Sequence, residues 1–373
     1  MPQYLLDRFN KVGQKRILSL DGGGIRGALT LGYLKKMETI LREKENNPHY
    51  LLSNYFDLIG GTSTGAIIAT LLALGKSVDE ITEVYMQLGG EIFGEKRNWW
   101  NPLETFKFFK AEFGEKKLEN ELKKYVGNIT LGSDEIKTGL CIVAKRADTN
   151  STWPLINHPK GKYYNENKNI PLWQALRATS AAPSYFIPQM IDVGNGQIGA
   201  FVDGGVSMAN NPSLTLLMVA TLKGFPFHWK LGEENISLYS VGTGYTEYHK
   251  HKGQIDDAWL LSWAKSVPDM LMQDASWQNQ IMLQWLSNSP TAKEVDTEMG
   301  DLEQDLICDK PLLKYYRFNI CISQNSLNGL GLKRDFTEAD IRSIAEMSNA
   351  SNRFLLNEIG LKVAENEVFE KYF

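Results

Sequence analysis

Cysteine is scarce in this sequence. Three cysteines, Cys141, Cys308 and Cys321, occur among 373 residues, and each lies next to apolar neighbours. They are too few and too scattered along the chain for a disulfide framework or a metal site. We therefore interpret them as small residues of the hydrophobic core, and we expect no metal ion in this protein.

Long apolar runs and long basic runs are also missing. No stretch reaches the length that a bilayer-spanning helix needs. The chain from Met1 onward has no apolar segment typical of a secretory signal. The formal net charge is −4, and a chain with no long basic run is not expected to bind nucleic acid. These absences predict a cytoplasmic protein whose contact with a membrane is peripheral.

The composition is that of a folded α/β protein. Apolar residues make up 43% and charged residues 23%, which is typical of a protein with a sizeable core. Strand-like and helix-like segments alternate, which predicts a mostly parallel sheet with helices on both faces. The expected strands are Arg16–Leu20, Tyr55–Ile59, Thr138–Arg146, Ala200–Val202, Asn235–Val241 and Leu313–Ile322.

We expect one domain over residues 1–373, because no linker, internal repeat or low-complexity segment interrupts the pattern. The expected helices cover Ala28–Glu43, Ala66–Leu72, Ser77–Leu88, Pro171–Thr179, a segment capped by Asn211 with Pro212 as its first residue, and most of Thr337–Phe373. A further long helix is expected over Asp256–Ser289, broken at Pro268. Apart from the expected strand Leu313–Ile322, the C-terminal region, residues 256–373, is thus expected to be helical.

The segment Gly61-Thr62-Ser63-Thr64-Gly65 stands between an apolar strand-like run and an apolar helix-like run. That context fits a G-x-S-x-G nucleophile elbow, in which a sharp turn presents a serine at the start of a helix. The helix N-terminus would favour negative charge developing on Ser63. The alternative is a glycine-rich turn in which Ser63 only caps the helix.

A second glycine-rich loop, Asp21-Gly22-Gly23-Gly24-Ile25-Arg26-Gly27, follows the first expected strand. Adjacent glycines allow backbone N–H groups to converge on an anion, as an oxyanion hole requires. The same loop also fits G-x-G-x-x-G, so a dinucleotide site is an alternative. The acidic residue that such a site needs at the end of the second strand is missing, because that strand runs into Gly61–Gly65.

The nucleophile needs a base, and Asp203 is the best-placed candidate. It leaves a short apolar strand, and the two glycines after it allow close approach to another loop. A Ser–His–Asp triad is the alternative, with His228, His249 or His251 as the base. None of these histidines stands at an evident strand end. An isolated D-G-G is also commonly a plain turn.

Two aromatic or sulfur-rich stretches have more than one interpretation. In Ile92–Phe113, aromatic side chains at helical spacing alternate with lysines, which fits either a bilayer interface or core packing. In Asp256–Ser289, methionines and tryptophans could line an acyl channel, form the protomer interface of a homo-oligomer, or pack in the core.

With these motifs in hand, the chain resembles the patatin-like phospholipases. The resemblance covers roughly residues 16 to 245 and rests on several motifs in the order of that family. They are Asp21–Gly27, Gly61–Gly65, Ala178–Pro183, Asp203–Gly205 with Asn210–Pro212, and more weakly Ser240–Gly244.

The resemblance implies a three-layer patatin-like fold that hydrolyses acyl esters of membrane phospholipids. Ser63 would be the nucleophile and Asp203 the base of a dyad without histidine, metal or cofactor. An acyl-serine intermediate would form and then be hydrolysed by water. Arg26 would support the oxyanion loop, and the hole itself would be lined by backbone N–H groups of Gly22, Gly23, Gly24 and Thr64.

The chain also resembles bacterial members of the family that degrade membranes in antiphage signalling and are switched on by a cyclic dinucleotide. The resemblance implies such an activator and action at the inner face of the membrane. No nucleotide motif in the chain supports the activator. Lys145 and Arg146, or the loop Lys160–Lys162, could contact its phosphates, and the alternative is ordinary solvated charge.

Overall fold

A computed structural model describes residues 2–92, 107–183, 185–194, 196–246 and 260–373. Its described residues form one eight-stranded sheet with the strand order β5-β6-β3-β2-β1-β7-β8, and β4 pairs with β3 beside this path. The strands are β1 (Lys15–Leu20), β2 (Leu58–Thr62), β3 (Gly139–Arg146), β4 (Ser151–Ile156), β5 (Gln189–Asp192), β6 (Ile198–Asp203), β7 (Ile236–Val241) and β8 (Lys314–Phe318).

The central strands are parallel and one edge is antiparallel. β3, β2, β1, β7 and β8 run in the same direction, whereas β4 and β6 are antiparallel to β3, and β5 is antiparallel to β6. The expected α/β architecture with a mostly parallel sheet is therefore confirmed. β4 and β5 lie in segments that we had not predicted as strands.

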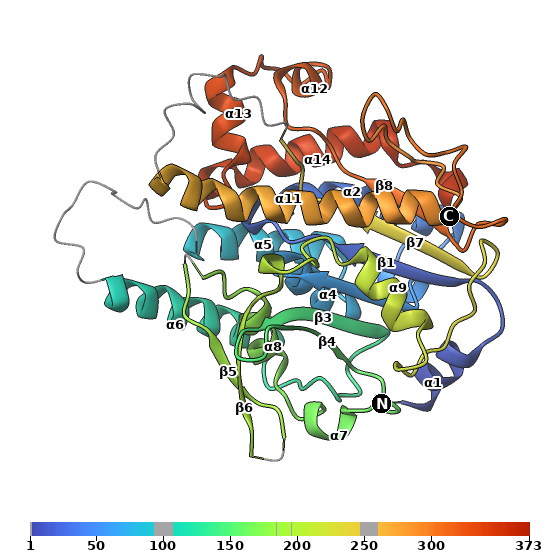
Figure 1. Cartoon of the computed structure of the whole chain (residues 1–373), viewed down its shortest axis with the longest axis vertical. Coiled ribbons are helices and arrows are strands. Elements are labelled where there is room, and N and C mark those ends of the chain that lie inside the picture. Colours follow the sequence, from blue (N-terminus) through green and yellow to red (C-terminus); the bar gives the residue numbers. More distant parts are fainter. Residues whose placement is uncertain (1, 93–106, 184, 195, 247–259) are drawn as a thin grey trace.

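Helices cover both faces of this sheet (Figure 1). The α-helices are α1 (Gln3–Asn10), α2 (Gly27–Lys44), α3 (Leu52–Tyr55), α4 (Thr64–Ala73), α5 (Val78–Ile92), α6 (Lys107–Val126), α7 (Tyr164–Asn167), α8 (Leu172–Thr179), α9 (Ser213–Thr221), α11 (Leu260–Leu286), α12 (Gln324–Asn328), α13 (Glu338–Ala345) and α14 (Arg353–Glu367). Short 3-10 turns are η1 (Gly24–Arg26), η3 (Gly204–Val206), η4 (Ala350–Asn352) and η5 (Glu370–Tyr372).

The alternation of side chains along the strands divides the core into two parts. In β3, Leu140, Ile142 and Ala144 pack with the apolar residues of α2, α4, α5, α8 and α14. Cys141 and Val143 point to the opposite face, where they pack with α1, α9 and α11. Successive residues of a strand face opposite sides, so a strand that is apolar throughout buries both faces. The three-layer arrangement follows from this pattern.

The register of the sheet brings the two predicted site residues together. β2 pairs with β3 so that Thr62 lies opposite Val143. β6 pairs with the same strand so that Asp203 lies opposite Ala144. Because residues 143 and 144 are adjacent, β2 and β6 end at neighbouring points of β3. Ser63, which follows Thr62, therefore stands beside Asp203.

Four expectations about element boundaries were wrong. β2 begins at Leu58 and not at Tyr55, which belongs to α3. α11 is continuous through Pro268, where we had predicted a break, because a proline removes one backbone hydrogen bond without preventing helical dihedral angles. α9 begins at Ser213 with Pro212 at the N-cap, one residue later than expected. The Asn211 side chain nevertheless accepts a 3.2 Å hydrogen bond from the Ser213 N–H. The last strand ends at Phe318, not at Ile322.

Candidate active site

Ser63 lies at a sharp turn between β2 and α4. Its φ of 53° and ψ of −127° put a residue with a side chain in a region that favours glycine. Such strain persists only where the surrounding structure imposes it, and it is typical of functional sites. The strand, the turn and the helix follow one another as the predicted nucleophile elbow requires.

The glycines on either side of Ser63 permit this turn. A Cβ on Gly65 would lie 2.4 Å from the carbonyl oxygen of Leu20, and a Cβ on Gly61 would lie 2.4 Å from the backbone of Gly65. The backbones of β1, β2 and α4 therefore meet at a distance that leaves no room for a side chain. Both motif glycines are required by packing at the point where the serine is presented.

The hydroxyl of Ser63 donates a 2.7 Å hydrogen bond to Oδ2 of Asp203. Ser63 occupies the N-cap position of α4, yet its side chain makes no capping hydrogen bond. The geometry therefore disagrees with the interpretation in which this serine only caps the helix. The two residues are 140 positions apart in the sequence.

Asp203 is buried at the end of β6, and the two glycines after it allow that position. A Cβ on Gly204 would lie 2.4 Å from the carbonyl oxygen of Val143, so the chain passes β3 in close contact. The N–H of Gly205 donates a 2.7 Å hydrogen bond to Oδ1 of Asp203. Burial raises the pKa of Asp203 to about 6, although the hydrogen bonds from Ser63 and Gly205 act in the opposite direction.

The small-residue segment Ala178–Pro183 holds both members of this pair. The N–H of Ser63 donates a 2.9 Å hydrogen bond to Oγ1 of Thr179. The N–H of Asp203 donates a 3.0 Å hydrogen bond to the carbonyl oxygen of Ala181. In the sequence this segment was recognised only as a motif, with no role assigned to it. The structure shows that it fixes the serine and the carboxylate through their backbones.

The glycine loop Asp21–Gly27 lies against the elbow. A Cβ on Gly22 would lie 3.3 Å from the Cβ of Ser63, which shows how close the two turns are. The N–H of Gly22 donates a 2.9 Å hydrogen bond to the carbonyl oxygen of Asn210, so this amide is engaged within the protein. Within the described residues, the N–H groups of three other predicted donors have no protein acceptor: Gly23, Gly24 and Thr64.

Arg26 is buried at the end of the glycine loop and contacts the C-terminal region. Its Nη1 is 3.4 Å from the carbonyl oxygen of Ala345, and its own N–H donates to the carbonyl oxygen of Gly23. The neighbouring Ile25 N–H donates a 2.8 Å hydrogen bond to the carbonyl oxygen of Met347. Arg26 and Ile25 thus join this loop to the C-terminal region, and a supporting role for Arg26 stays a prediction.

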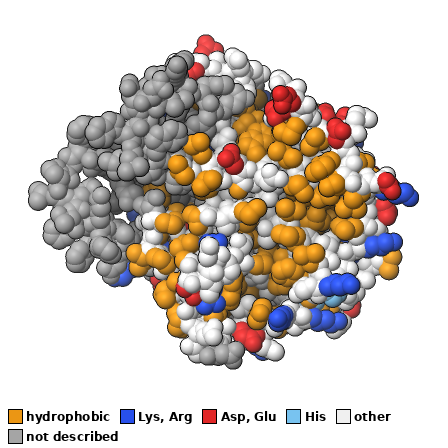
Figure 2. All heavy atoms as spheres, viewed as in Figure 1, with side chains coloured by type: hydrophobic (Ala, Val, Ile, Leu, Met, Phe, Trp, Pro, Cys, Tyr) orange, Lys and Arg blue, Asp and Glu red, His pale blue; other side chains and the backbone are white. Residues whose placement is uncertain are grey.

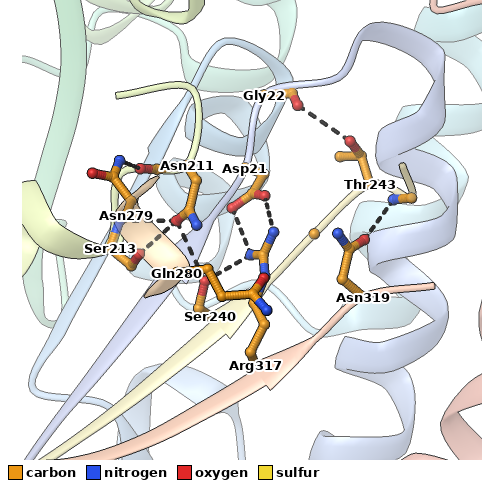
Figure 3. A network of polar contacts seen from close by, with 12 residues as sticks. Asp21, Gly22, Asn211, Ser213, Ser240, Thr243, Asn279, Gln280, Arg317 and Asn319 are labelled. Atoms are coloured by element: carbon orange, nitrogen blue, oxygen red, sulfur yellow. Dashed lines mark hydrogen bonds and ion pairs between the residues drawn. The ribbon is translucent and has the colours of Figure 1, made fainter. Parts of the chain in front are cut away.

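A buried ion pair holds the first residue of the loop. Nη1 and Nη2 of Arg317 donate to the two carboxylate oxygens of Asp21 at 3.0 and 2.6 Å, as Figure 3 shows. Nη1 also donates a 2.8 Å hydrogen bond to Oγ of Ser240. Both members of the pair are almost inaccessible to water. Arg317 was not predicted as part of the site, because it lies in β8, outside the sequence motifs.

The rest of the network in Figure 3 joins this loop to the next two motifs. Thr243 Oγ1 donates a 3.2 Å hydrogen bond to the carbonyl oxygen of Gly22. Asn279 of α11 donates a 2.8 Å hydrogen bond to the carbonyl oxygen of Asn211. Oδ1 of Asn319 accepts a 2.8 Å hydrogen bond from the N–H of Gly244. Residues of α11 and of the segment after β8 therefore complete the support of the motif-bearing loops.

The described histidines lie away from the dyad. His158 is buried against the rings of Phe9 and Phe227, with ring centroids 5.3 and 4.8 Å away. His228 is exposed on the segment after α9. His249 and His251 fall outside the described residues. In the part of the chain that the structure describes, no imidazole is hydrogen-bonded to the serine or the carboxylate.

Two further predicted features are only partly described. Of the aromatic stretch Ile92–Phe113, residues 93–106 fall outside the described residues, and residues 107–113 open α6. The first candidate phosphate-binding pair is engaged within the protein. Arg146 forms an ion pair with Asp148 at 2.8 Å, and Lys145 donates a 2.9 Å hydrogen bond to a backbone carbonyl oxygen. Lys160 and Lys162 line a pocket. Among the described residues, no group of three or more His, Cys, Asp and Glu side chains could hold a metal ion.

Large apolar side chains are exposed on the segment after Asp203 and on α11. Val206 and Met208 follow Asp203 in the sequence and are 45% and 66% exposed, and Leu271 of α11 is 62% exposed. α11 is close to this segment, since its Asn279 donates a 2.7 Å hydrogen bond to the carbonyl oxygen of Met208. Figure 2 shows many hydrophobic side chains on the face that carries α9 and α11. No described helix has the length and apolar character needed to cross a bilayer.

The family model of the patatin-like phospholipases matches residues 18–217, which include the glycine loop, the elbow and Asp203. This chain belongs to the patatin-like phospholipase family. The match ends within α9, so β7, α11 and β8 lie outside it.

Two curated relatives and one solved structure illustrate the similarity. A cGAMP-activated phospholipase of Vibrio cholerae is 35% identical over 205 residues, covering 54% of this chain and 56% of that protein. Patatin-17 of Solanum cardiophyllum is 29% identical over 246 residues, covering 62% of this chain and 60% of that protein. The crystal structure of VipD from Legionella pneumophila aligns with a TM-score of 0.35 at 12% identity, covering 92% of this chain and 67% of that one. The matches thus span little more than half the length of either curated relative.

Proposed function

We propose that this chain hydrolyses the carboxylic esters of membrane phospholipids with Ser63 as nucleophile and Asp203 as base. The observation that carries the proposal is the 2.7 Å hydrogen bond from the strained Ser63 to the buried Asp203. Membership of the patatin-like phospholipase family supports the class of substrate.

The first half of the reaction forms an acyl-serine. Oγ of Ser63 attacks the ester carbonyl carbon while Oδ2 of Asp203 takes the hydroxyl proton. Negative charge then develops on the carbonyl oxygen, and the unpaired N–H groups of Gly23, Gly24 and Thr64 are the donors available to it. When the tetrahedral intermediate collapses, the carbon–oxygen bond of the ester breaks and Asp203 returns the proton to the departing alcohol.

The second half repeats these steps with water. Asp203 takes a proton from a water molecule as the water oxygen attacks the acyl carbon. The same backbone donors hold the second tetrahedral oxyanion. Its collapse breaks the bond to Oγ of Ser63, which regains a proton from Asp203, and the fatty acid leaves. No group other than the dyad, the donors and water is required.

The surroundings of Asp203 make it a better base than an ordinary aspartate. Its pKa of about 6 is closer to neutral pH than the usual value of about 3.9, so the carboxylate attracts the serine proton more strongly. At pH 7 the group is still roughly nine-tenths ionised, as a base must be. A bound lipid would exclude water and strengthen every charge interaction in the site.

The apolar side chains around the dyad suit a membrane substrate. Val206, Met208 and Leu271 would insert among acyl chains or lie on the bilayer surface, with the elbow next to them. Exposed apolar side chains of this kind are otherwise a liability in water. We therefore include peripheral contact with a membrane in the proposal.

The relative from Vibrio cholerae is named for its activation by cGAMP, and we extend this property to the present chain. The test is release of fatty acid from phospholipid vesicles by wild type and Ser63→Ala, each with and without cGAMP. We expect release by wild type, an increase with cGAMP and none by Ser63→Ala. Release that persists in Ser63→Ala would refute the dyad, and equal release with and without cGAMP would refute the activation.

A further inference from the structure

A basic pocket of about 700 Å³ lies outside the candidate active site. Six lysines line it, and no aspartate or glutamate does: Lys11, Lys15, Lys160, Lys162, Lys223 and Lys230. In the described part of the chain, none of these lysines is ion-paired with a carboxylate. Six positive charges close together repel one another, and a bound anion would relieve this repulsion. The pocket is therefore expected to attract anions.

The pocket is at the opposite end of the sheet from Ser63. Lys15 is the first residue of β1, whose last residue, Leu20, leads into the glycine loop. Asn235, another lining residue, directly precedes β7. Ser63 lies beyond the carboxyl end of β2, which is parallel to both strands. A ligand in this pocket therefore cannot be the ester that the dyad would attack.

The floor of the pocket is aromatic and held in place. Trp229 Nε1 donates a 3.1 Å hydrogen bond to the carbonyl oxygen of Phe9, and the ring of Phe227 lies 5.2 Å from that of Phe9. His158 lies under these rings, and its Nδ1 accepts a 3.1 Å hydrogen bond from the N–H of Lys160. Burial lowers the pKa of His158 to about 4, with the charges of Lys160 and His228 acting in the same direction.

The volume, the charge and the rings together identify a class of ligand. We propose that this pocket binds a soluble molecule with two or more phosphate groups and a flat ring system, of the size of a cyclic dinucleotide. Several lysine ammonium groups can meet separate phosphates, and Phe225, which also lines the pocket, offers an apolar surface to a base. A pocket of 300–1,000 Å³ suits a ligand of this size.

The location favours a free ligand over a lipid headgroup. If the apolar side chains around the dyad face the bilayer, the opposite end of the sheet faces away from it. The lysines could not then reach the phosphates of the same membrane. This step rests on the proposed function, because it uses the membrane contact and the activation proposed there.

α9 connects the pocket with the site. At its start, Asn210 accepts the hydrogen bond from Gly22, and a Cβ on Gly205 would lie 2.9 Å from the Asn210 side chain. Beyond its end, the chain forms one wall of the pocket over residues 223–230, and Trp229 N–H donates to the carbonyl oxygen of Ala220. A ligand that moved this wall would act on α9, and Asn210, in the segment just before α9, contacts both site loops.

The experiment measures binding by calorimetry in a Ser63→Ala background, with cGAMP and inorganic pyrophosphate as probes. The test variants are Lys160→Glu with Lys162→Glu, and Lys223→Glu with Lys230→Glu. Lys310→Glu with Lys333→Glu is the matched control, since it changes two exposed lysines elsewhere by the same charge. We expect at least a tenfold weaker binding of cGAMP in both test variants, unchanged binding in the control, and competition by pyrophosphate.

The outcomes separate this inference from the proposed activity. Unchanged cGAMP binding in both test variants, or no binding of either probe by the parent protein, would refute the proposal that this pocket binds the ligand. Loss of sedimentation with phosphatidylglycerol vesicles in the test variants, with cGAMP binding intact, would also overturn it in favour of a membrane contact. Because Ser63→Ala cannot form an acyl-serine, binding is measured independently of hydrolysis. A failure of lipid hydrolysis alone would therefore leave the pocket standing.

Discussion

The guanidinium of Arg317 holds both carboxylate oxygens of Asp21, the residue that opens the glycine loop. The two residues are 296 positions apart, and the arginine comes from a strand outside the motifs that identify the family. A buried pair of charges is stable only while both partners remain. The position of the glycine loop Asp21–Gly27 therefore depends on β8.

We expect Arg317→Met to destabilise the fold strongly. The substitution would leave the Asp21 carboxylate buried without a counter-charge, which typically costs about 3–5 kcal/mol. Adding Asp21→Asn should restore part of the loss, because no unpaired charge then remains. Thermal and urea unfolding of the two variants measure both effects. Equal stability of Arg317→Met and wild type would contradict this role.

The exposed ion pair between Arg334 and Asp340 provides a matched control. Its two side chains lie 2.8 Å apart but are 44% and 31% exposed. Arg334→Met should therefore change the free energy of unfolding by at most about 1 kcal/mol. A similar loss in the two arginine variants would mean that burial of the pair does not matter.

The pKa of Asp203 predicts how the rate depends on pH. The base must be ionised, so kcat/KM for a soluble ester should fall about tenfold per pH unit below about pH 6 and level off above it. A histidine base would give a similar profile, so the profile is also measured for His49→Asn, His228→Asn, His249→Asn and His251→Asn. We expect each to keep the inflection. Loss of activity in any one of them would favour the triad.

Asp203→Asn should raise stability at neutral pH while it lowers activity. The folded-state pKa of Asp203 lies above its unfolded value, so the cost of burying the ionised group grows as pH rises from about 4 to about 6 and is complete above pH 6. The asparagine variant avoids this cost, which amounts to about 1–3 kcal/mol at pH 7 and should vanish near pH 4. Unfolding curves at both pH values test this. An Asp203→Asn variant that is less stable than wild type at pH 7 would contradict the claim that burying the ionised Asp203 carboxylate costs stability.

Gly65 should tolerate no side chain. A Cβ at this position would lie 2.4 Å from a backbone oxygen of β1, so Gly65→Ala should destabilise by about 1–3 kcal/mol and disturb the elbow. Gly224 is the comparison, since nothing lies within 4 Å of a Cβ there. Gly224→Ala should change stability by less than about 1 kcal/mol. Chemical denaturation measures the free energy of unfolding of both variants. A larger loss in Gly224→Ala than in Gly65→Ala would contradict this prediction.

The apolar side chains near the dyad should matter for membranes and not for chemistry. Met208→Glu with Leu271→Glu should weaken binding to phospholipid vesicles and lower vesicle hydrolysis at least about tenfold, because charge at an apolar contact opposes burial. Hydrolysis of a soluble ester should stay within about twofold of wild type. Phe354→Glu with Leu361→Glu, on α14, is the control and should leave both unchanged. Equal vesicle hydrolysis in the two double variants would refute the proposed membrane contact.

Local patterns in the sequence were enough to predict most of the sheet and the pairing of Ser63 with Asp203. The glycine-rich segments Asp21–Gly27, Gly61–Gly65 and Asp203–Gly205 each follow an expected strand, and their order along the chain is that of the family. The antiparallel strands β4 and β5 were not predicted. Ser151–Ile156 contains a proline, and both it and Gln189–Asp192 contain polar residues, so these segments become strands only through their pairing with β3 and β6.

The support of the site was harder to predict, because it comes from long-range contacts. Thr179 lay in a segment recognised only for its small residues, and its hydrogen bond to Ser63 depends on how α8 meets β2. Arg317 did leave a signal that could have been used. It stands in Lys314–Phe318, where an arginine among apolar residues of an expected strand needs a buried acid as a partner. The sequence does not say which acid that is.

The most direct test of the dyad is covalent labelling with a fluorophosphonate, followed by mass spectrometry of the labelled peptide. The serine must be activated by Asp203 to react, so the account predicts one labelled residue, Ser63, with no label in Ser63→Ala and at least about tenfold slower labelling in Asp203→Asn. Label on another residue, or an unchanged labelling rate in Asp203→Asn, would contradict it.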